Sequence, residues 1–201
     1  MSNKIEEKYH HSKFAFKIIS LMHHNPLLPY FRNPYKLLKA AGLKPGQKVL
    51  EVGCGPGFFT IPAAKIVGGE EGVVYAADVH PLAIERAKGK IEREGMKNVK
   101  PMLANASDTG LPDQSIDLAF IFGLRYIAGG LKNGVVENRI LKPGGVLSFE
   151  KTKSSAKKLI VEVERSGFVY SGRQASKQGY SYLQRRNETK NPGNERDERR
   201  E

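Results

Sequence analysis

The chain has 201 residues, a formal net charge of +12 and one cysteine. At ~100–200 residues per domain, this length predicts one domain with a core large enough to need no disulfides. A single cysteine excludes an internal disulfide and a multi-cysteine zinc site, and it suits a reducing cytoplasm. No apolar run is long enough to span a bilayer, and residues 1–7 lack a signal-peptide layout, so we expect a cytoplasmic protein without a transmembrane segment.

The positive charge lies on the two flanks of the chain. By count, residues 1–48 carry +7 and residues 151–183 carry +5, whereas residues 49–150 carry −1. A basic flank can attract nucleic acid, anionic lipid or an acidic substrate, but plain solubilising lysines give the same composition. No RNA-binding motif accompanies the charge, so nucleic-acid binding remains open without a motif to support it.

The N-terminal residues are expected to be helical. Apolar side chains recur on one face over residues 14–22, which predicts an amphipathic helix that ends before the prolines that follow. A second, short helix is expected over residues 34–41, with Gly42 as its C-cap. The amphipathic helix could rest on a membrane surface, although such a stripe more often packs on its own domain.

From residue 48 onward, strand and helix patterns alternate along the chain. We expect strands over residues 48–52, 73–77, 99–104, 116–122 and 146–150, and helices over 59–67, 81–94, within 131–140 and over 155–166. Such alternation predicts a mainly parallel sheet with helices on both faces. Two final strands, 168–173 and 180–184, have a short connection and should therefore be antiparallel.

The first strand leads into a loop that contains Gly53, Gly55 and Gly57. Glycine permits a left-handed backbone and close approach of a ligand, and the loop precedes a helix N-terminus, which favours an anionic group. The second strand is followed by Asp78, whose carboxylate can accept hydrogen bonds from two ribose hydroxyls. A tight structural turn would also use glycine, and Asp78 could instead cap the next helix. The combination favours a cofactor site.

These residues resemble those of a known family. The pattern Glu51-x-Gly53-x-Gly55-x-Gly57, followed by Asp78, Asp117 and Leu141-Lys142-Pro143-Gly144-Gly145, is similar to that of class I S-adenosylmethionine-dependent methyltransferases, in particular the small-molecule "type 11"-like branch. The similarity covers roughly residues 40–183.

The resemblance implies an α/β, Rossmann-like fold with a doubly wound, seven-stranded, mostly parallel sheet and an antiparallel last strand. It also implies that residues 1–42 form a helical lid and residues 43–184 the S-adenosylmethionine-binding methyltransferase domain. Residues 185–201 contain no apolar side chain that could repay the entropy of ordering, so their composition predicts a disordered charged tail.

Matched position by position, the resemblance implies a set of residues that bind S-adenosylmethionine. The glycines would lie against its methionine part, Glu51 would orient that end, Asp78 would hold the ribose and Val79 would pack on the adenine. Asn105 stands where the family often has aspartate, and its carbonyl can accept the same adenine hydrogen bond. The whole set is Glu51, Gly53, Cys54, Gly55, Gly57, Asp78, Val79, Asn105, Ala106 and Phe122.

Other residues are assigned no chemistry. We interpret Cys54 as a small buried residue rather than a reactive thiol. Asp117 is either a strand-end residue oriented by backbone contacts or part of the site, and we favour the first interpretation. No metal site is predicted, and no catalytic residue is assigned, because methyl transfer needs a base only when the nucleophile keeps its proton.

The predicted function is transfer of a methyl group from S-adenosylmethionine to a small-molecule acceptor, in one interpretation an amphipathic one such as a lipid or a quinone-like molecule. Two alternatives stay open: an RNA or protein methyltransferase, and a non-catalytic cofactor-binding member of the fold. A nicotinamide dehydrogenase is disfavoured because Phe58 stands where its fingerprint has glycine. The sequence predicts no oligomeric state.

Overall fold

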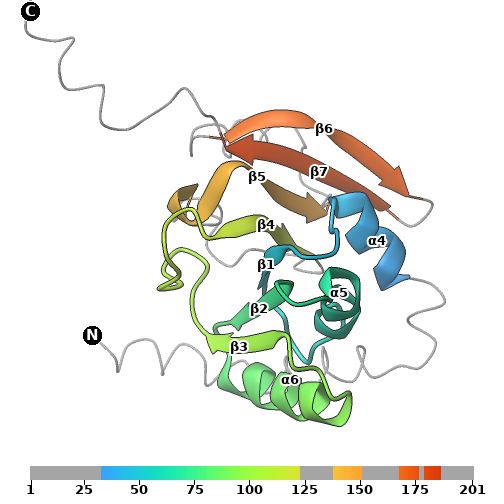
Figure 1. The fold of residues 1–201 in the computed structure, drawn as a ribbon, viewed down its shortest axis with the longest axis vertical. Coiled ribbons are helices and arrows are strands. Elements are labelled where there is room, and N and C mark those ends of the chain that lie inside the picture. The colour runs from blue at the N-terminus through green and yellow to red at the C-terminus, as the bar shows by residue number, and fades with distance from the viewer. Residues whose placement is uncertain (1–32, 123–137, 151–167, 177–178, 187–201) are drawn as a thin grey trace, which may run out of the picture.

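The computed structural model describes residues 33–122, 138–150, 168–176 and 179–186 (Figure 1). Its elements are α4 (Pro34–Ala41), β1 (Lys48–Val52), α5 (Thr60–Val67), β2 (Val73–Asp78), α6 (Pro81–Arg93), β3 (Val99–Leu103), β4 (Ile116–Ile121), the 3-10 turn η2 (Asn138–Ile140), β5 (Leu141–Glu150), β6 (Phe168–Ser176) and β7 (Gly179–Arg186). The expected amphipathic stretch 14–22, the helix over 155–166, residues 131–137 and the tail beyond 186 lie outside the described residues.

All strands belong to one sheet with the order β3-β2-β1-β4-β5-β7-β6. Strand β1 is parallel to β2 and β4, and β2–β3 and β4–β5 are parallel as well. Strand β7 is antiparallel to β5 and to β6. The predicted α/β, Rossmann-like fold is confirmed. The strand order reverses between β1 and β4, and ligands of open α/β sheets bind at the carboxyl ends of the strands beside such a reversal.

Helix α4 shows how local sequence sets an element's limits. The side chain of Asn33 accepts a hydrogen bond from the Lys36 N–H at 3.1 Å, and Pro34 occupies the first turn, where no N–H is needed. Gly42, with φ of 98°, ends the helix. The predicted bounds, 34–41, are therefore confirmed.

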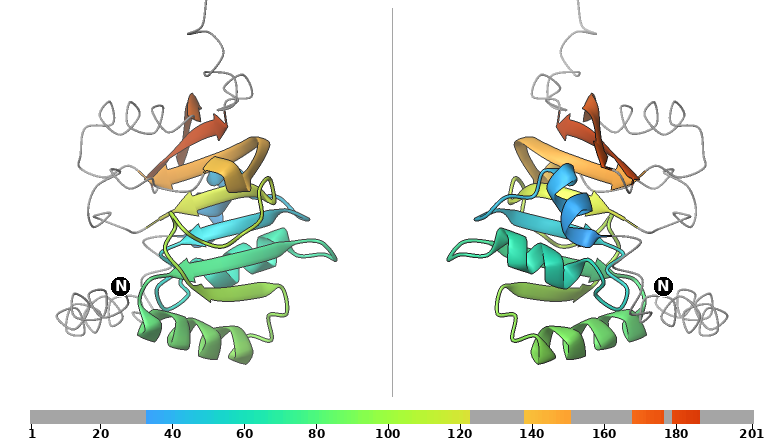
Figure 2. Two further views of the ribbon diagram at one scale, coloured as in Figure 1. Left: turned by 90° about the vertical axis from the view of Figure 1, so that its left-hand side faces the viewer. Right: turned by 90° about the vertical axis from the view of Figure 1, so that its right-hand side faces the viewer.

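The core occupies both faces of the central strands. Leu118 and Phe120 of β4 belong to a cluster that includes residues of α4, α5 and α6, whereas Ala119 belongs to a second cluster with Leu50 and Leu147. Figure 2 shows α4 and α5 covering one face of the sheet. Burial on both faces fixes β1 against its neighbours, so the loop at the carboxyl end of β1 starts from a well-defined position.

The Lys-Pro-Gly-Gly segment was expected to be a loop before a strand at 146–150, and this prediction was wrong. Strand β5 begins at Leu141 and includes the segment as a bulge, because Leu141 pairs with Ile116 while Val146 already pairs with Leu118. Gly145 is needed there: a Cβ on it would lie 2.8 Å from the Lys142 carbonyl oxygen.

The last two strands are longer than expected. Strand β6 continues to Ser176, and β7 extends to Arg186, beyond residue 184, at which the domain was expected to end. Arg185 pairs with Val146 of β5 and with Val169 of β6. The last residues of β7 are polar and show no alternation of apolar side chains, so their place in the sheet comes from backbone pairing with β5 and β6.

Strand β3 forms one edge of the sheet. It contains Pro101, which has no N–H to donate, and it ends at Leu103, whose side chain is 59% exposed. In register, Leu103 pairs with Asp78 of β2. The edge strand therefore places an exposed apolar side chain beside the end of β2.

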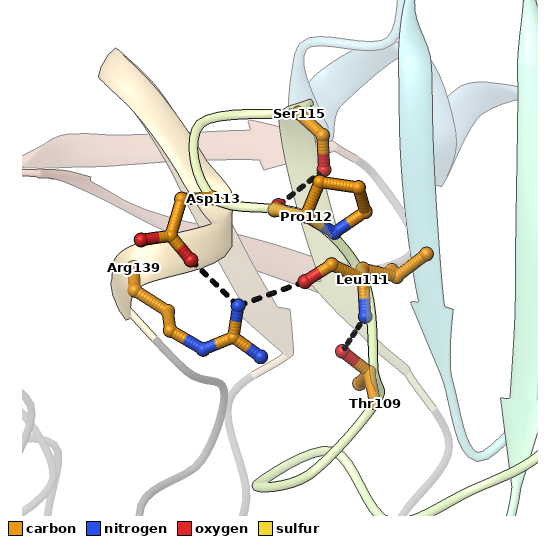
Figure 3. A network of polar contacts seen from close by, with 6 residues as sticks. All are labelled: Thr109, Leu111, Pro112, Asp113, Ser115 and Arg139. Carbon is orange, nitrogen blue, oxygen red and sulfur yellow. Dashed lines mark hydrogen bonds and ion pairs between the residues drawn. The ribbon is translucent and has the colours of Figure 1, made fainter.

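Arg139 links two segments at the amino ends of β4 and β5 (Figure 3). Its Nη1 donates to the Leu111 carbonyl at 2.8 Å and to Asp113 Oδ1 at 2.7 Å. Its own carbonyl accepts from the N–H of Gln114, which has a positive φ of 51°. These bonds join the loop before β4 to the turn η2 at the amino ends of the strands, opposite the carboxyl ends at which ligands of such sheets bind.

Asp117 lies at the same amino edge, as the second residue of β4. Its Oδ2 accepts the Lys48 N–H at 2.8 Å, and its Oδ1 pairs with Lys142 Nζ at 2.6 Å. These contacts join β4 to β1 and to β5 at the amino ends of the strands, away from the glycine loop at the carboxyl end of β1. The geometry supports the structural interpretation of this residue.

We expect Asp117→Ala to lower the free energy of unfolding by about 1–2 kcal/mol, because it removes a backbone acceptor and an ion-pair partner together. Asp113→Ala is the control: its ion pair with Arg139 is more exposed and is expected to contribute under about 1 kcal/mol. Urea unfolding of both variants measures the difference. Equal effects would contradict the cross-strand role of Asp117.

Candidate functional site

The glycine loop after β1 has a backbone that other residues rarely adopt. Gly53, Gly55 and Gly57 have φ values of 71°, 53° and 83°. The N–H groups of Gly53 and Cys54 both donate to the Ala77 carbonyl, at 2.8 and 3.0 Å, and the Gly57 N–H donates to the Cys54 carbonyl at 3.0 Å. The loop is therefore a turn fastened to the end of β2.

Two of these glycines have different surroundings. Among the residues that the structure describes, a Cβ built on Gly55 would meet no atom within 4 Å beyond its chain neighbours, so open space lies against the backbone there. A Cβ on Gly57 would instead touch the Lys90 Cδ at 3.5 Å and the Thr60 Oγ1 at 3.6 Å. Gly55 thus leaves room for a ligand against the main chain, whereas Gly57 packs against the protein.

Asp78 closes the loop from the neighbouring strand. Its Oδ2 accepts the Gly55 N–H at 2.9 Å, and its Oδ1 accepts the His80 N–H at 2.9 Å. The N-cap of α6 is His80, whose Nδ1 accepts from Leu82, so the alternative that Asp78 itself caps this helix is wrong. Each carboxylate oxygen keeps a further lone pair, so this half-buried group can also accept from a ligand hydroxyl.

Glu51 is the buried acid of the site, only 2% exposed. Its Oε2 accepts the Thr60 hydroxyl at 2.6 Å. Burial raises the pKa of Glu51 to about 8; the Thr60 hydrogen bond and the charge of Lys90 oppose this shift, and the charge of Asp78 adds to it. Near neutral pH this carboxyl is therefore mainly protonated in the protein without ligand.

Cys54 is buried inside the loop. Burial, with the negative charges of Glu51 and Asp78 nearby, raises the pKa of its thiol far above the usual range. A thiol that stays protonated is a poor nucleophile, in agreement with the interpretation of Cys54 as a packing residue.

The loops after β2 and β3 carry three further expected residues. Val79 is 42% exposed directly after Asp78. Asn105 is exposed, and its Oδ1 accepts the Ser107 N–H at 3.1 Å, which closes a turn around Ala106. The structure therefore brings Val79 to the edge that holds Asp78, while the Asn105 side chain is used within its own loop.

Phe122, the remaining expected residue, follows β4 directly and is buried. Its ring packs edge-on against Phe59, with centroids 5.4 Å apart, and tilted against Phe120 at 5.2 Å. The ring belongs to the core beneath the loop. It packs the end of β4 against Phe59 at the start of α5.

Two residues near the loop were not foreseen, Thr60 and Lys90. Thr60 is fully buried and orients Glu51, and the Lys90 Nζ donates to the Gly57 carbonyl at 3.0 Å. The position of Thr60 in the first turn of α5 was a usable signal, because that turn follows the loop directly. Lys90 lies 33 residues beyond Gly57 and carries no local pattern.

Within the described ranges, no group of three or more histidine, cysteine or acidic residues is arranged to hold a metal ion. None of the helices in those ranges has both the length and the apolar run that a bilayer crossing requires.

We expect the Glu51 carboxyl to make stability depend on pH. Its pKa rises from 4.5 to about 8 on folding, so its favourable contribution is present below pH 4.5 and is lost as pH rises towards 8. The free energy of unfolding of Glu51→Gln, whose side chain stays neutral, should exceed that of the wild type at pH 8.5 by at least about 1.4 kcal/mol, or about 3–6 °C in Tm, and by much less at pH 5.

Thermal unfolding without ligand, followed at both pH values, measures this effect. Glu92→Gln on the exposed side of α6 is the matched control and should show no such difference. A Glu51→Gln variant that loses stability equally at both pH values would contradict the raised pKa.

Comparison with known proteins relates this geometry to a family. The model of the family described as "Methyltransferase domain" matches residues 43–189. The ubiquinone/menaquinone biosynthesis C-methyltransferase UbiE of Teredinibacter turnerae is 33% identical over 123 residues, which are 59% of this chain and 49% of that protein. The demethylmenaquinone methyltransferase of Geobacillus stearothermophilus is 33% identical over 111 residues, 55% of this chain and 47% of that protein. The chain thus spans about half the length of the curated relatives it matches.

Solved structures give the same picture. A SAM-dependent methyltransferase from Aquifex aeolicus is 26% identical, with a TM-score of 0.70, over 84% of this chain and 96% of that one. The [4+2]-cyclase SpnF, at 16% identity and a TM-score of 0.63 over 78% of this chain and 80% of that one, shares the fold alone. Since the family model covers most of the sequence, the chain belongs to the methyltransferase-domain family of class I S-adenosylmethionine-dependent methyltransferases.

Proposed function

We propose that this chain transfers a methyl group from S-adenosylmethionine to a small, amphipathic acceptor of quinone-like chemistry. The observation that carries the proposal is the open space at Gly55 beside the Asp78 carboxylate, at the carboxyl ends of β1 and β2. The quinone-biosynthesis methyltransferases among its relatives support the acceptor class. Because the chain spans about half of those proteins, activity and acceptor both need direct tests.

The residues at this edge fit the proposed cofactor. A ribose needs hydroxyl acceptors, and the Asp78 oxygens retain lone pairs after their two backbone contacts. Close passage of a ligand needs a backbone without a side chain, and Gly55 provides it. Exposed Val79 offers an apolar surface for a flat ring next to Asp78. We assign ribose binding to Asp78 and adenine packing to Val79.

The methionine end is assigned to the glycine loop and Glu51. Thr60 fixes the direction of the Glu51 carboxyl, so the group is already oriented before a ligand binds. When bound, S-adenosylmethionine supplies an electrophilic methyl group on a sulfonium. The contribution of the chain is alignment and exclusion of water, because a direct displacement requires the acceptor atom in line with the methyl group.

The two alternative functions predict different experimental behaviour. An RNA or protein methyltransferase would use the basic flanks, and its substrate binding would weaken steeply with salt. A non-catalytic member of the fold would bind the cofactor and methylate nothing. Both alternatives keep the same cofactor site. The first differs from the proposal in the acceptor, and the second differs in the absence of any methyl transfer.

Asp78→Ala should weaken binding of S-adenosylhomocysteine by about 2–4 kcal/mol, because charge-assisted hydrogen bonds to the ribose are lost. Isothermal titration calorimetry measures this loss, with NAD as the ligand control. The control is Asp113→Ala, which removes an exposed acid in the loop before β4, at the amino ends of the strands. This variant should bind S-adenosylhomocysteine as the wild type does. Unchanged affinity in a folded Asp78→Ala protein would refute the ribose assignment.

The acceptor is tested with S-adenosylmethionine labelled in its methyl group. We expect label in the organic extract when a reduced, short-chain demethylmenaquinone is offered, and none with Asp78→Ala. Label in acid-precipitable RNA or protein from an extract would overturn the acceptor class. Binding of S-adenosylhomocysteine without transfer to any of these acceptors would favour the non-catalytic reading.

A further inference from the structure

Lys90 stands out as a charged side chain drawn into the protein at the glycine loop. It belongs to α6, yet its Nζ reaches across to the Gly57 carbonyl at 3.0 Å. Its aliphatic stem covers the same glycine, with Cδ 3.5 Å from the position that a Gly57 Cβ would take. Both the ammonium group and the aliphatic part of Lys90 therefore lie against Gly57 of the loop.

Burying a lysine costs free energy, which its partners must offset. Desolvation lowers the pKa of Lys90, and the charges of Glu94 and Glu51 oppose that shift. A lysine on the outer face of α6 would avoid this cost. The half-buried position is thus explained by what the ammonium group contacts, which is the loop carbonyl.

Helix packing alone does not require this contact. Helix α5 is also joined to the end of α6 by the Lys65–Glu94 ion pair at 3.0 Å, and to the segment before β3 by the hydrogen bond from Asn98 Nδ2 to the Ala64 carbonyl at 2.9 Å. The Lys90 bond differs from these two because it ends on the glycine loop instead of on α5. Removal of Lys90 would leave both of these contacts in place.

The loop is held from two sides. At its start, the N–H groups of Gly53 and Cys54 are fixed on Ala77, and the Gly55 N–H is fixed on Asp78. At its end, Lys90 holds the Gly57 carbonyl. The open space at Gly55 lies between these two attachments, so a shift at either one would change the room available to a ligand.

We infer that Lys90 is a positioning residue, which fixes the glycine loop in its ligand-binding conformation through the Gly57 carbonyl and so sets the affinity for the cofactor. This inference rests on the proposed function, because the ligand is S-adenosylmethionine or its product. It concerns a residue that touches the loop and is not assigned a contact with the ligand itself.

The test compares Lys90→Met, which keeps the apolar stem, with Lys90→Arg, which keeps a cationic donor. We expect Lys90→Met to weaken S-adenosylhomocysteine binding by about tenfold, while Lys90→Arg restores most of the affinity. Lys88→Met, an exposed lysine of the same helix, is the matched control and should bind as the wild type does. Calorimetry gives the affinities, and thermal unfolding gives the Tm of each variant.

Amide hydrogen exchange separates positioning from general stability. In Lys90→Met, the Gly55 and Gly57 amides should exchange faster than in the wild type, while the amides of β1 and β4 keep their protection. Uniformly faster exchange over the sheet would mean that Lys90 stabilises the whole domain, and it would overturn the inference.

The affinities and the folding of the Lys90 variants also test the positioning role. Wild-type affinity in folded Lys90→Met would overturn the inference, as would equal losses in the Met and Arg variants. If Lys90→Met does not fold, Lys90→Gln takes its place, and failure of both to fold would overturn the inference. Absence of S-adenosylhomocysteine binding by the wild type would instead refute the proposed function, so the two failures are distinguishable.

Discussion

The hydrogen bond between the Asp78 carboxylate and the Gly55 N–H is the contact on which the site depends. It joins the ends of β1 and β2 at the point where the loop must leave the sheet. An acid at the end of β2 gives a negative partner to a backbone N–H that would otherwise need water or a ligand. The same carboxylate orders the entry to α6 through His80, so one side chain sets the geometry of two connections.

The site combines two acids in different environments. Asp78 is half-buried and accepts two backbone N–H groups, whereas Glu51 is enclosed and holds one hydroxyl. Burial raises the pKa of Glu51 and so favours its neutral form, while the Thr60 hydrogen bond and the charge of Lys90 favour its charged form. The electrostatics of the loop are therefore shared among β1, β2 and α6, although the recognisable motif lies only after β1.

The parts that sequence predicted well are those set by near neighbours. Helix α4 and strand β1 follow from caps and apolar patterns, and the positions of the three glycines and Asp78 at the ends of β1 and β2 follow from the buried strands that precede them. The Lys-Pro-Gly-Gly bulge was misread because glycine and proline usually mark loops, and only the pairing of Leu141 with Ile116 keeps the segment in the sheet. Lys90 could not be found, because its partner is distant in sequence and is a main-chain carbonyl.

The edge strand β3 has a consequence for how the molecule meets its neighbours. A free strand edge is a template on which another chain can extend the sheet, and an apolar side chain such as Leu103 would add to that attraction. Pro101 interrupts the row of donors along β3, so a foreign strand could not pair continuously there. The protein can thus expose apolar surface beside Asp78 while that strand edge resists aggregation.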